Sequence, residues 1–367
     1  MTTLYIHIPF CQKKCNFCSF VVAIGKEDAA DAYLDCLEGE ANFYHGAAVK
    51  TIYIGGGTPT FMPEAQLGRL FEIIKKNFSY APASELTIEA NPENIDKNKA
   101  KLLRENGINR ISLGVQSLQE KYLKYLGRVH NRARALEAFE ILRKEGFSNI
   151  NVDMMYSFPQ QTLEEIKKDI KEAASLGSDH ISFYALTIEE GSKFYHLNVA
   201  LGENEILKQQ YELLTNGIEE SGFSQYEVSN FAKQGKESLH NRHYWEGGNY
   251  IGLGVGAHSH SDGIRSWNTA SIPKYISKIQ SGQKAVEGTE QLTVEKRFME
   301  GLLFGLRMNE DVCLEDLEKK YAFPLPIEKT DVIENCVNNG LLMRKNSHLK
   351  TTFRGRLLLD EICARLI

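Results

Sequence analysis

Short β-rich segments alternate with helical patterns through residues 4–220 of the chain. The candidate strands are residues 4–8, 51–54, 85–89, 110–113, 151–155 and 180–185. The helical patterns span residues 28–43, 64–77, 97–105, 132–145, 163–176 and 205–220. Such alternation predicts an α/β fold with a parallel sheet and outer helices. Ligands of parallel sheets bind beyond the carboxyl ends of the strands, so polar motifs at those ends should converge on one site.

The pattern changes after residue 230. Residues 231–267 are rich in Gly, His and Asn and contain both Trp residues of the chain, without a clear amphipathic period. A helical pattern returns at Phe298, Leu302, Leu303 and Leu306. A chain of 367 residues suits one large domain and a smaller one. We therefore expect an α/β domain at 1–230, a loop region and linker at 231–290, and a small, mainly helical domain at 291–367.

The composition argues against several classes of partner. The net charge of −5 and the pI near 6.1 do not favour nucleic acid as the main partner. The sequence has no apolar run of about 18 residues and no signal-peptide pattern, so we expect a cytoplasmic protein. Three of the seven cysteines fall within residues 11–18. An odd count with one tight cluster indicates a metal or redox site in a reducing compartment rather than a disulfide framework.

The tight cluster is Cys11-x3-Cys15-x2-Cys18, in a loop directly after the first candidate strand. Three thiolates at this spacing can surround one small iron–sulfur cluster. A saturated 4Fe–4S cluster needs about four cysteines, so one iron would keep an open coordination position. The alternatives are a zinc site completed by His7 and reduced structural thiols. Zinc sites usually show two separated cysteine pairs, and this sequence has no second pair, so the iron–sulfur interpretation is favoured.

Polar and small residues follow several of the candidate strands. Residues 55–58, Gly-Gly-Gly-Thr, end the second strand, where glycines let the backbone approach a ligand closely. Glu89 ends the third strand and could pair with an ammonium group, and Arg128 could clamp a carboxylate with two hydrogen bonds. Asp153, on the fifth strand, could accept hydrogen bonds from ribose hydroxyls. Each of these residues alone is more often an ordinary surface or capping residue, so only their combination indicates a site.

The CxxxCxxC spacing after a strand resembles the signature of the radical-SAM superfamily. The wider run Tyr-x-His-Ile-Pro-Phe-Cys, residues 5–11, resembles the branch that holds the oxygen-independent coproporphyrinogen III oxidases and the heme chaperone HemW family. The resemblance covers nearly the whole chain. It implies a partial (β/α)6 radical-SAM barrel, a 4Fe–4S cluster on Cys11, Cys15 and Cys18, and S-adenosylmethionine on the open iron. The positions that contact S-adenosylmethionine in the family correspond here to Tyr5, Gly56, Gly57, Thr58, Glu89, Gln116, Arg128, Asp153, Met155 and Ala185.

One segment departs from the family pattern. Where the family has Gly-Leu-Pro-Gly-Gln-Thr, residues 157–162 read Ser-Phe-Pro-Gln-Gln-Thr. Two glycines are missing, so the resemblance does not fix the backbone path after the fifth strand.

Two features favour the heme chaperones over the oxidases. The oxidases carry CxxxCxxCxC, whereas this chain has Phe20 in place of the fourth cysteine, and they have an N-terminal extension that we do not expect here. Residues 240–245 match the HNxxYW motif of the chaperone branch. The resemblance therefore implies heme contacts by His240, Asn241, Arg242, Tyr244 and Trp245, with His243, His258 and His260 as rival ligands of the iron.

The chemistry of this motif suits a porphyrin. His240 offers a neutral imidazole to iron, the rings of Tyr244 and Trp245 could cover a porphyrin face, and Arg242 could meet a propionate. We expect a chaperone that hands heme to acceptor proteins, such as respiratory ones, with a reducing partner such as flavodoxin if S-adenosylmethionine is cleaved. The alternative is an oxidase in which a 5′-deoxyadenosyl radical attacks a porphyrinogen propionate. A scaffold that transfers nothing is a third interpretation, and we assign no catalytic residue.

Residues 252–257 match the loose dinucleotide fingerprint GxGxxA. The residues that follow, His-Ser-His-Ser-Asp-Gly, do not read as a helix, so a pyrophosphate would lack the helix N-terminus that binds it. We therefore expect neither nicotinamide nor flavin.

Overall fold

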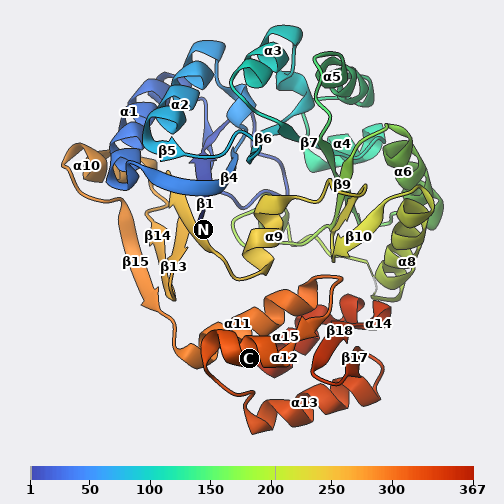
Figure 1. Cartoon of the computed structure of the whole chain (residues 1–367). Helices are drawn as coiled ribbons and strands as arrows, with labels where there is room; N and C mark the ends of the chain where they lie inside the picture. Colours follow the sequence, from blue (N-terminus) through green and yellow to red (C-terminus); the bar gives the residue numbers. More distant parts are fainter. Residues whose placement is uncertain (1, 203) are drawn as a thin grey trace.

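The computed structural model describes residues 2–202 and 204–367 (Figure 1). Six parallel strands form its centre and lie side by side in chain order. They are β1 (Thr2–Ile8), β4 (Ala47–Gly56), β6 (Glu85–Ala90), β7 (Arg110–Gln116), β8 (Ile150–Tyr156) and β9 (His180–Ala185). Five of them are buried along most of their length and β4 is buried mainly in its second half, which is why each reads as an apolar run in the sequence. The predicted α/β fold and all six strands are confirmed.

Helices cover the outer face of these strands, as predicted, and form an arc around the sheet (Figure 1). They are α1 (Ala30–Ala41), α2 (Glu64–Asn77), α3 (Lys97–Glu105), α5 (Arg132–Lys144), α6 (Leu163–Ser175) and α8 (Asn204–Glu220). Side-chain caps fix several starts: Asp96 accepts from the Lys99 amide, and Thr162 and Glu165 form a capping box on α6. The short helices α4 (Glu120–Leu126) and α7 (Lys193–His196) and the two-residue strands β2 (Phe10–Cys11), β3 (Ala23–Ile24) and β5 (Phe78–Ser79) were not predicted.

The expectation of a loop region after residue 230 was wrong, because this segment extends the sheet at both edges. On one edge β11 (Asn230–Ala232) pairs antiparallel with β9, and β10 (Ser224–Glu227) pairs with β11. On the other, β12 (Asn249–Leu253) pairs parallel with β1 and leads into the antiparallel strands β13 (His258–Ser261), β14 (Ile264–Asn268) and β15 (Val286–Gln291). The helices here are α9 (Leu239–Trp245) and α10 (Ile272–Gln280). Elements this short and polar carry no clear period, which explains the error.

The C-terminal segment is mainly helical, as predicted. It contains α11 (Val294–Arg307), α12 (Leu314–Tyr321), α13 (Ile327–Asn338), α14 (Phe353–Leu357) and α15 (Leu359–Leu366). A small antiparallel sheet of β16 (Val312–Cys313), β18 (His348–Thr351) and β17 (Leu342–Lys345) was not predicted. The segment has a hydrophobic core of its own around Phe298, Leu302 and Ile333. The domain limits at residues 230 and 290 remain a prediction.

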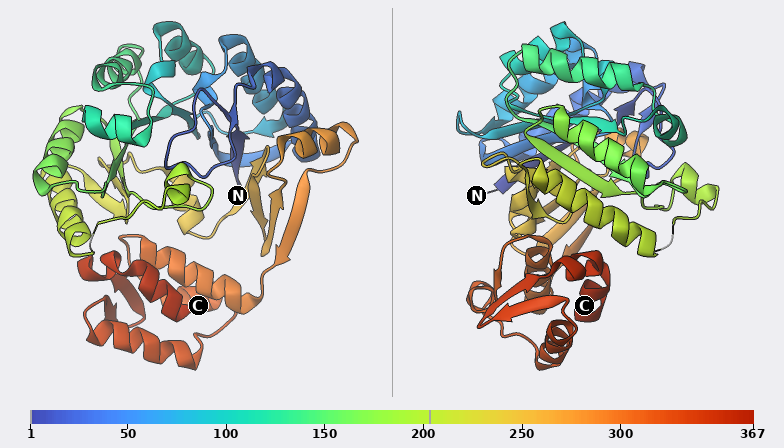
Figure 2. Two further views of the ribbon diagram at one scale, coloured as in Figure 1. Left: turned by 180° about the vertical axis from the view of Figure 1, so that it is seen from behind. Right: turned by 90° about the vertical axis from the view of Figure 1, so that its right-hand side faces the viewer.

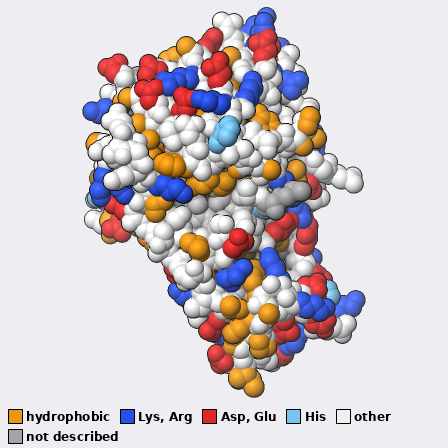
Figure 3. Space-filling view, turned by 60° about the vertical axis from the view of Figure 1, so that its left-hand side comes forward, with side chains coloured by type: hydrophobic (Ala, Val, Ile, Leu, Met, Phe, Trp, Pro, Cys, Tyr) orange, Lys and Arg blue, Asp and Glu red, His pale blue; other side chains and the backbone are white. Residues whose placement is uncertain are grey.

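The C-terminal domain lies beneath the open side of the barrel (Figure 2). Figure 3 shows it as a separate lobe, with acidic and basic side chains interspersed on the visible face. A partly buried ion pair joins the two parts, because Arg307 Nε on α11 donates to the buried Glu227 Oε2 on β10 at 2.9 Å. Among the described residues, no helix is both long enough and apolar enough to cross a bilayer.

Candidate functional site

The carboxyl ends of the central strands open into a cavity of about 900 Å³, which we call the cluster cavity. Its floor is the barrel, and Arg307, Arg356 and Leu359 of the C-terminal domain close the far side. The convergence expected of a parallel sheet is therefore present. All but one of the residues expected to hold the iron–sulfur cluster or S-adenosylmethionine line it: Cys11, Cys15, Cys18, Gly56, Gly57, Thr58, Glu89, Gln116, Arg128, Asp153, Met155 and Ala185.

The cysteine loop is held in place by the side chains of Thr58 and Arg128 and by its own Asn16. Cys11 Sγ lies 3.4 Å from Thr58 Oγ1, and Arg128 Nη1 donates to Cys15 Sγ at 3.3 Å. Asn16 ties the loop to α4, donating from Nδ2 to the Tyr125 carbonyl at 2.7 Å. Burial raises the pKa of Cys11 to about 11. A metal centre that binds this thiol must therefore displace its proton, since the thiolate is the ligand.

His7 does not complete a zinc site with these cysteines. Its Nδ1 is hydrogen-bonded to Tyr5 Oη at 3.1 Å and its Nε2 to the Val21 carbonyl at 3.0 Å, so both ring nitrogens are engaged. Its side chain lines a different cavity. Among the described residues, no three His, Cys, Asp or Glu side chains lie close enough to hold one metal ion. The cysteines, placed around a larger cavity, suit a cluster better than a single ion.

The glycines at the end of β4 bring this strand end against the cysteine loop. The Gly57 amide donates to the Ile8 carbonyl and the Thr58 amide to the Phe10 carbonyl, both at 2.8 Å. A Cβ atom on Gly57 would lie 2.8 Å from the backbone of Pro9 and Phe10, which cannot move aside as a side chain can. Only glycine permits this contact, and it sets the position of the residues leading into Cys11.

Replacing Gly57 with Ala should destabilise the protein by about 1–3 kcal/mol, the usual cost of overpacking, and should impair cluster assembly. Gly68→Ala on α2 is the matched control, because a Cβ there meets no atom within 4 Å. That change should be neutral or stabilise the helix by about 0.5–1 kcal/mol. Chemical denaturation and iron analysis of both variants check this. Equal stability and equal iron content in the two would contradict the role of Gly57.

Glu89 is a buried carboxyl group at the end of β6. It accepts from Tyr53 Oη at 2.9 Å and from the Gly56 amide at 3.1 Å. Burial, with some repulsion from Asp153, raises its pKa to about 7. It forms no ion pair with any described residue. A buried acid without a cation is costly to ionise, and a ligand ammonium placed beside it would remove that cost.

Arg128, like Glu89, lines the cluster cavity without a partner of opposite charge among the described residues. Its Nη2 donates to Asn91 Oδ1 at 2.7 Å and to the Gly114 carbonyl at 2.8 Å. Its Nε is buried without a partner among the described residues, and no described carboxylate pairs with it. Asn91, which was not predicted as a site residue, joins Arg128 to Thr58 through a 2.9 Å hydrogen bond from its Nδ2 to Thr58 Oγ1. Its place beside Pro92 at a strand end was the available signal.

The ribose side of the predicted site lies on β7 and β8. Asp153 accepts from Ser112 Oγ and from Asn151 Nδ2, both at 2.8 Å, and burial raises its pKa. Gln116 adopts a φ of 70°, at a point where the β7–β8 register shifts. Non-glycine residues seldom adopt this conformation, and such strain concentrates at ligand sites.

The two residues that replace the family's glycines after β8 both have a left-handed backbone conformation. Ser157 and Gln160 occupy the two positions where the family has glycine, and their φ angles are 63° and 60°. The chain therefore keeps a left-handed backbone there without the residue best suited to it. Each position costs about 1–2 kcal/mol relative to an unstrained backbone. The departure in sequence leaves the two left-handed turns in place.

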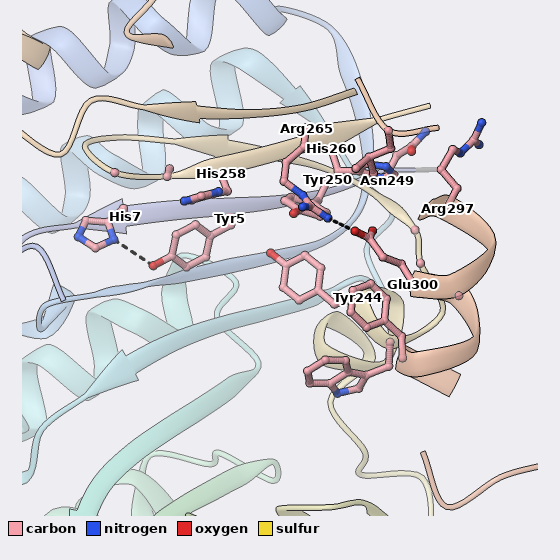
Figure 4. A pocket seen from close by; sticks show the side chains of 18 of the residues that line it. Tyr5, His7, Tyr244, Asn249, Tyr250, His258, His260, Arg265, Arg297 and Glu300 are labelled. Atoms are coloured by element: carbon pink, nitrogen blue, oxygen red, sulfur yellow. Dashed lines mark hydrogen bonds and ion pairs between the residues drawn. The ribbon is translucent and has the colours of Figure 1, made fainter. Parts of the chain in front are cut away.

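A second cavity, of about 650 Å³, lies beside the first and is walled mainly by aromatic rings (Figure 4). We call it the aromatic cavity. One wall is the sheet from β1 to β14, and the other is built from α9 and α11. Tyr5 lies here rather than in the cluster cavity, and its ring stacks on Tyr53 at 6.2 Å. Tyr5 is joined to the first cavity through Tyr53, whose hydroxyl donates to Glu89.

The HNxxYW motif forms α9 and divides between the cavity and the protein interior. Tyr244 and Trp245 line the aromatic cavity. His240 does not: it is 1% exposed, and its ring nitrogens are hydrogen-bonded to Thr51 Oγ1 at 2.8 Å and Tyr244 Oη at 2.9 Å. Arg242 pairs with Glu310 outside the cavity, and Asn241 does not line it. The expected heme residues are therefore only partly brought together.

The start of α9 explains why His240 points inward. Glu85, the first residue of β6, accepts from the amides of Leu239 and His240 at 2.9 and 3.0 Å, and Ser238 caps the helix. These bonds satisfy amides that a helix N-terminus leaves unpaired. They fix the helix with His240 against the barrel, where burial lowers the pKa of His240 to about 3. The imidazole is neutral and holds the Tyr244 hydroxyl.

The other histidines near this motif differ in whether they line the aromatic cavity. His243 is buried and its Nε2 is hydrogen-bonded to the Asn249 carbonyl at 2.8 Å, whereas His258 and His260 line the aromatic cavity. Ser19 and Phe20, directly after Cys18, line both cavities. The loop that carries the cysteines is thus the partition between the two sites.

Comparison with known proteins agrees with this geometry. Residues 5–173 match the family model of the Radical SAM superfamily. The fold matches a solved coproporphyrinogen III oxidase (HemN) from Escherichia coli with a TM-score of 0.89 and 24% identity, covering 100% of this chain and 89% of that one. At this identity the likeness concerns the fold. The barrel and its cysteine-lined cavity are those of a radical-SAM protein.

Curated relatives place the chain more narrowly. The heme chaperone HemW of Bacillus subtilis is 36% identical over 99% of this chain and 98% of its own length. The heme chaperone HemW of Lactococcus lactis is 32% identical over 98% of this chain and 97% of its own. The chain therefore belongs to the HemW family of radical-SAM proteins, and the resemblance seen in the cysteine and HNxxYW motifs is confirmed at the level of the family.

Proposed function

We propose that this protein is a cytoplasmic heme chaperone. In this proposal it holds a 4Fe–4S cluster and S-adenosylmethionine in the cluster cavity, binds heme in the aromatic cavity and passes the heme to acceptor proteins. The relatives that cover its full length are named heme chaperones, whereas its likeness to the oxidase is one of fold. We propose no role for nucleic acid. A reducing partner such as flavodoxin is needed only if S-adenosylmethionine is cleaved.

The residues that line the cluster cavity match the chemical groups of the two proposed cofactors. Cys11, Cys15 and Cys18 would hold the cluster, which supplies an open iron and an electron when reduced. The unpaired carboxyl group of Glu89 would receive the ammonium group of S-adenosylmethionine, and Arg128 its carboxylate. Both residues have ionisable side chains that lack an ion-pair partner among the described residues. The ligand would provide those charges, and the cavity walls would exclude water from them.

The observation that carries the proposal is the aromatic cavity itself. It is separate from the cluster cavity, and two residues of the HNxxYW motif form its helical wall. The Tyr244 ring meets Tyr250 edge-on at 4.8 Å, and the Trp245 ring meets Phe304 at 6.0 Å. A mainly apolar cavity of about 650 Å³ with a few polar groups suits a flat organic ligand of porphyrin size.

Positively charged side chains at the rim of the aromatic cavity suit the negatively charged propionates of heme. Arg297 and Lys320 line the cavity, and neither forms an ion pair with another described residue. Arg265 is instead held by Glu300 at 2.7 Å (Figure 4). In this proposal His240 acts through Tyr244: its neutral ring fixes the hydroxyl and so the angle of the tyrosine against the cargo. Such a residue would affect heme binding without touching heme.

Replacing Trp245 with Ala should weaken heme binding about ten- to hundredfold, because the loss of a buried ring contact costs about 1.5–3 kcal/mol. Tyr195→Ala is the matched control, since this exposed aromatic residue on α7 lines neither cavity. Absorbance titration with hemin measures both affinities. The wild-type protein should bind about one heme and release it to an apo-acceptor faster than spontaneous dissociation. Binding no better than nonspecific adsorption, or equal losses in both variants, would refute the proposal.

A further inference from the structure

Two imidazoles face the aromatic cavity from one strand. His258 and His260 are two residues apart on β13, so they point to the same face of the sheet. Both line the cavity and lie among its aromatic side chains in Figure 4. Strand geometry separates them by about 7 Å. They are therefore alternative ligands for one iron atom.

The histidines of the HNxxYW motif are not available in this arrangement. Each ring nitrogen of His240 already has a hydrogen-bond partner, Thr51 on one side and Tyr244 on the other. To reach a ligand, its ring would have to leave the barrel interior and abandon both bonds. His243 is likewise buried and bonded to the Asn249 carbonyl. An iron ligand must come from elsewhere on the cavity wall.

His258 is better placed than His260 for the iron of a heme whose propionates reach the cationic rim. His260 lies at the charged end of the cavity, where Arg265, Arg297 and Glu300 all act on its pKa. An iron on His260 would place the porphyrin centre where the propionates should be. His258 lies two residues away on β13, near Tyr5 and His7 and farther from Arg297 than His260 is (Figure 4). From there the propionate edge can extend to the rim.

The His258 side chain is exposed, which leaves its ring open to a ligand. The ring stacks on Trp267 of β14 at 6.1 Å with an interplanar angle of 29°. A Cβ atom on Gly252 of β12 would lie 2.0 Å from the His258 carbonyl oxygen, so glycine at this position lets β12 pack closely on the backbone of His258. No hydrogen bond to the His258 ring is found among the described residues. Partial desolvation, with the nearby charge of Arg265, lowers the pKa of His258 from its ordinary value of 6.5, which favours the neutral imidazole that coordinates a metal.

We propose that the imidazole of His258 is the axial ligand of the heme iron in the aromatic cavity, with the propionates directed to Arg297 and Lys320. This assignment rests on the proposed function. It gives the HNxxYW motif a different part: its tyrosine and tryptophan form the wall facing the porphyrin, and its histidine positions that wall. The ligand then comes from the strand that the GxGxxA-like segment leads into.

The test adds hemin to the full-length wild-type protein and to His258→Ala, His260→Ala, His240→Ala and His196→Ala. Optical, EPR and resonance Raman spectra report the ligation of the iron, and titration reports affinity. His258→Ala should lose the wild-type ligation and bind hemin at least tenfold more weakly, and added imidazole should restore the spectrum. His260→Ala and His240→Ala should keep the wild-type ligation, even where affinity falls. His196, exposed on α7, lies outside both cavities, so its variant should match the wild type.

The outcomes separate this inference from the function on which it rests. A wild-type ligation that survives in His258→Ala but is lost in His240→Ala or His260→Ala overturns the assignment and leaves the heme chaperone standing. Unchanged ligation in all variants, together with weak binding in Trp245→Ala, also overturns it, since the iron ligand then lies outside these histidines. A wild-type protein without a defined heme complex removes the proposed function itself.

Discussion

Replacing Cys11, Cys15 or Cys18 with Ala should each abolish the iron–sulfur cluster, reducing the iron of the anaerobically reconstituted protein from about four atoms per chain to nearly none. The three thiols line one cavity, and no other cysteine lines it. A cluster with three protein ligands cannot lose one and remain protected, because a second iron would be exposed to solvent. Iron and sulfide analysis, with the visible absorbance of the cluster, measures the effect.

The chain provides controls of the same residue type. Cys36 and Cys336 are buried in hydrophobic cores, at 2% and 1% exposure, and their replacement by Ala should keep the full iron content. Loss of iron in these variants would indicate a general failure to fold. Stoichiometric zinc in the wild-type protein, without charge-transfer absorbance, would exclude the iron–sulfur centre.

The barrel could be predicted because its physical causes are local. Strands buried on both faces must be apolar along their length, and the helices between them must be amphipathic, so both appear directly in the sequence. The residues of the cluster cavity followed from the same logic, since Glu89, Gln116 and Asp153 lie on strands whose carboxyl ends meet. A parallel sheet brings such residues together whatever the loops between them do.

The second cavity could not be predicted in this way. Its walls come from β12–β14 and α9, which are short, and from pairing with β1 across more than 240 positions of the chain. A motif match identifies His240 but does not say which face of α9 is buried. That depends on Glu85, a residue of a distant strand that holds the first turn of the helix. The cavity that Tyr5 lines could not be predicted for a similar reason: the alternation of β1 sets the face of Tyr5, but β12 decides which cavity lies on that face.

Binding of S-adenosylmethionine should be pH-dependent through Glu89. In the unliganded protein burial raises the pKa of this carboxyl group to about 7, so it is mostly protonated at pH 6. A bound ammonium group lowers that pKa, so binding releases a proton. Affinity should therefore fall as the pH decreases from 7 to 5, by up to about tenfold per pH unit. Calorimetric titration in two buffers of different ionisation enthalpy measures both the affinity and the proton released.

Glu89→Gln should remove this dependence. The neutral amide keeps the size of the side chain but not the charge, so binding should weaken by about 1.5–3 kcal/mol, or about ten- to hundredfold, at pH 7.5 and become flat between pH 5 and 7. Glu189→Gln is the matched control, because this carboxylate lies exposed at the edge of the same cavity and should change neither quantity. A pH dependence that persists in Glu89→Gln would assign the proton to another group.

The stability of the unliganded protein provides an independent check with a defined sign. A pKa raised from 4.5 to about 7 means that the folded state binds the proton more tightly than the unfolded chain does. The contribution of Glu89 to stability is then fully present below about pH 4.5 and is lost as the pH rises through 7. Glu89→Gln should therefore be at least as stable as the wild type at pH 8, while binding S-adenosylmethionine more weakly. A variant that loses both stability and binding would indicate that Glu89 supports the fold rather than the ligand.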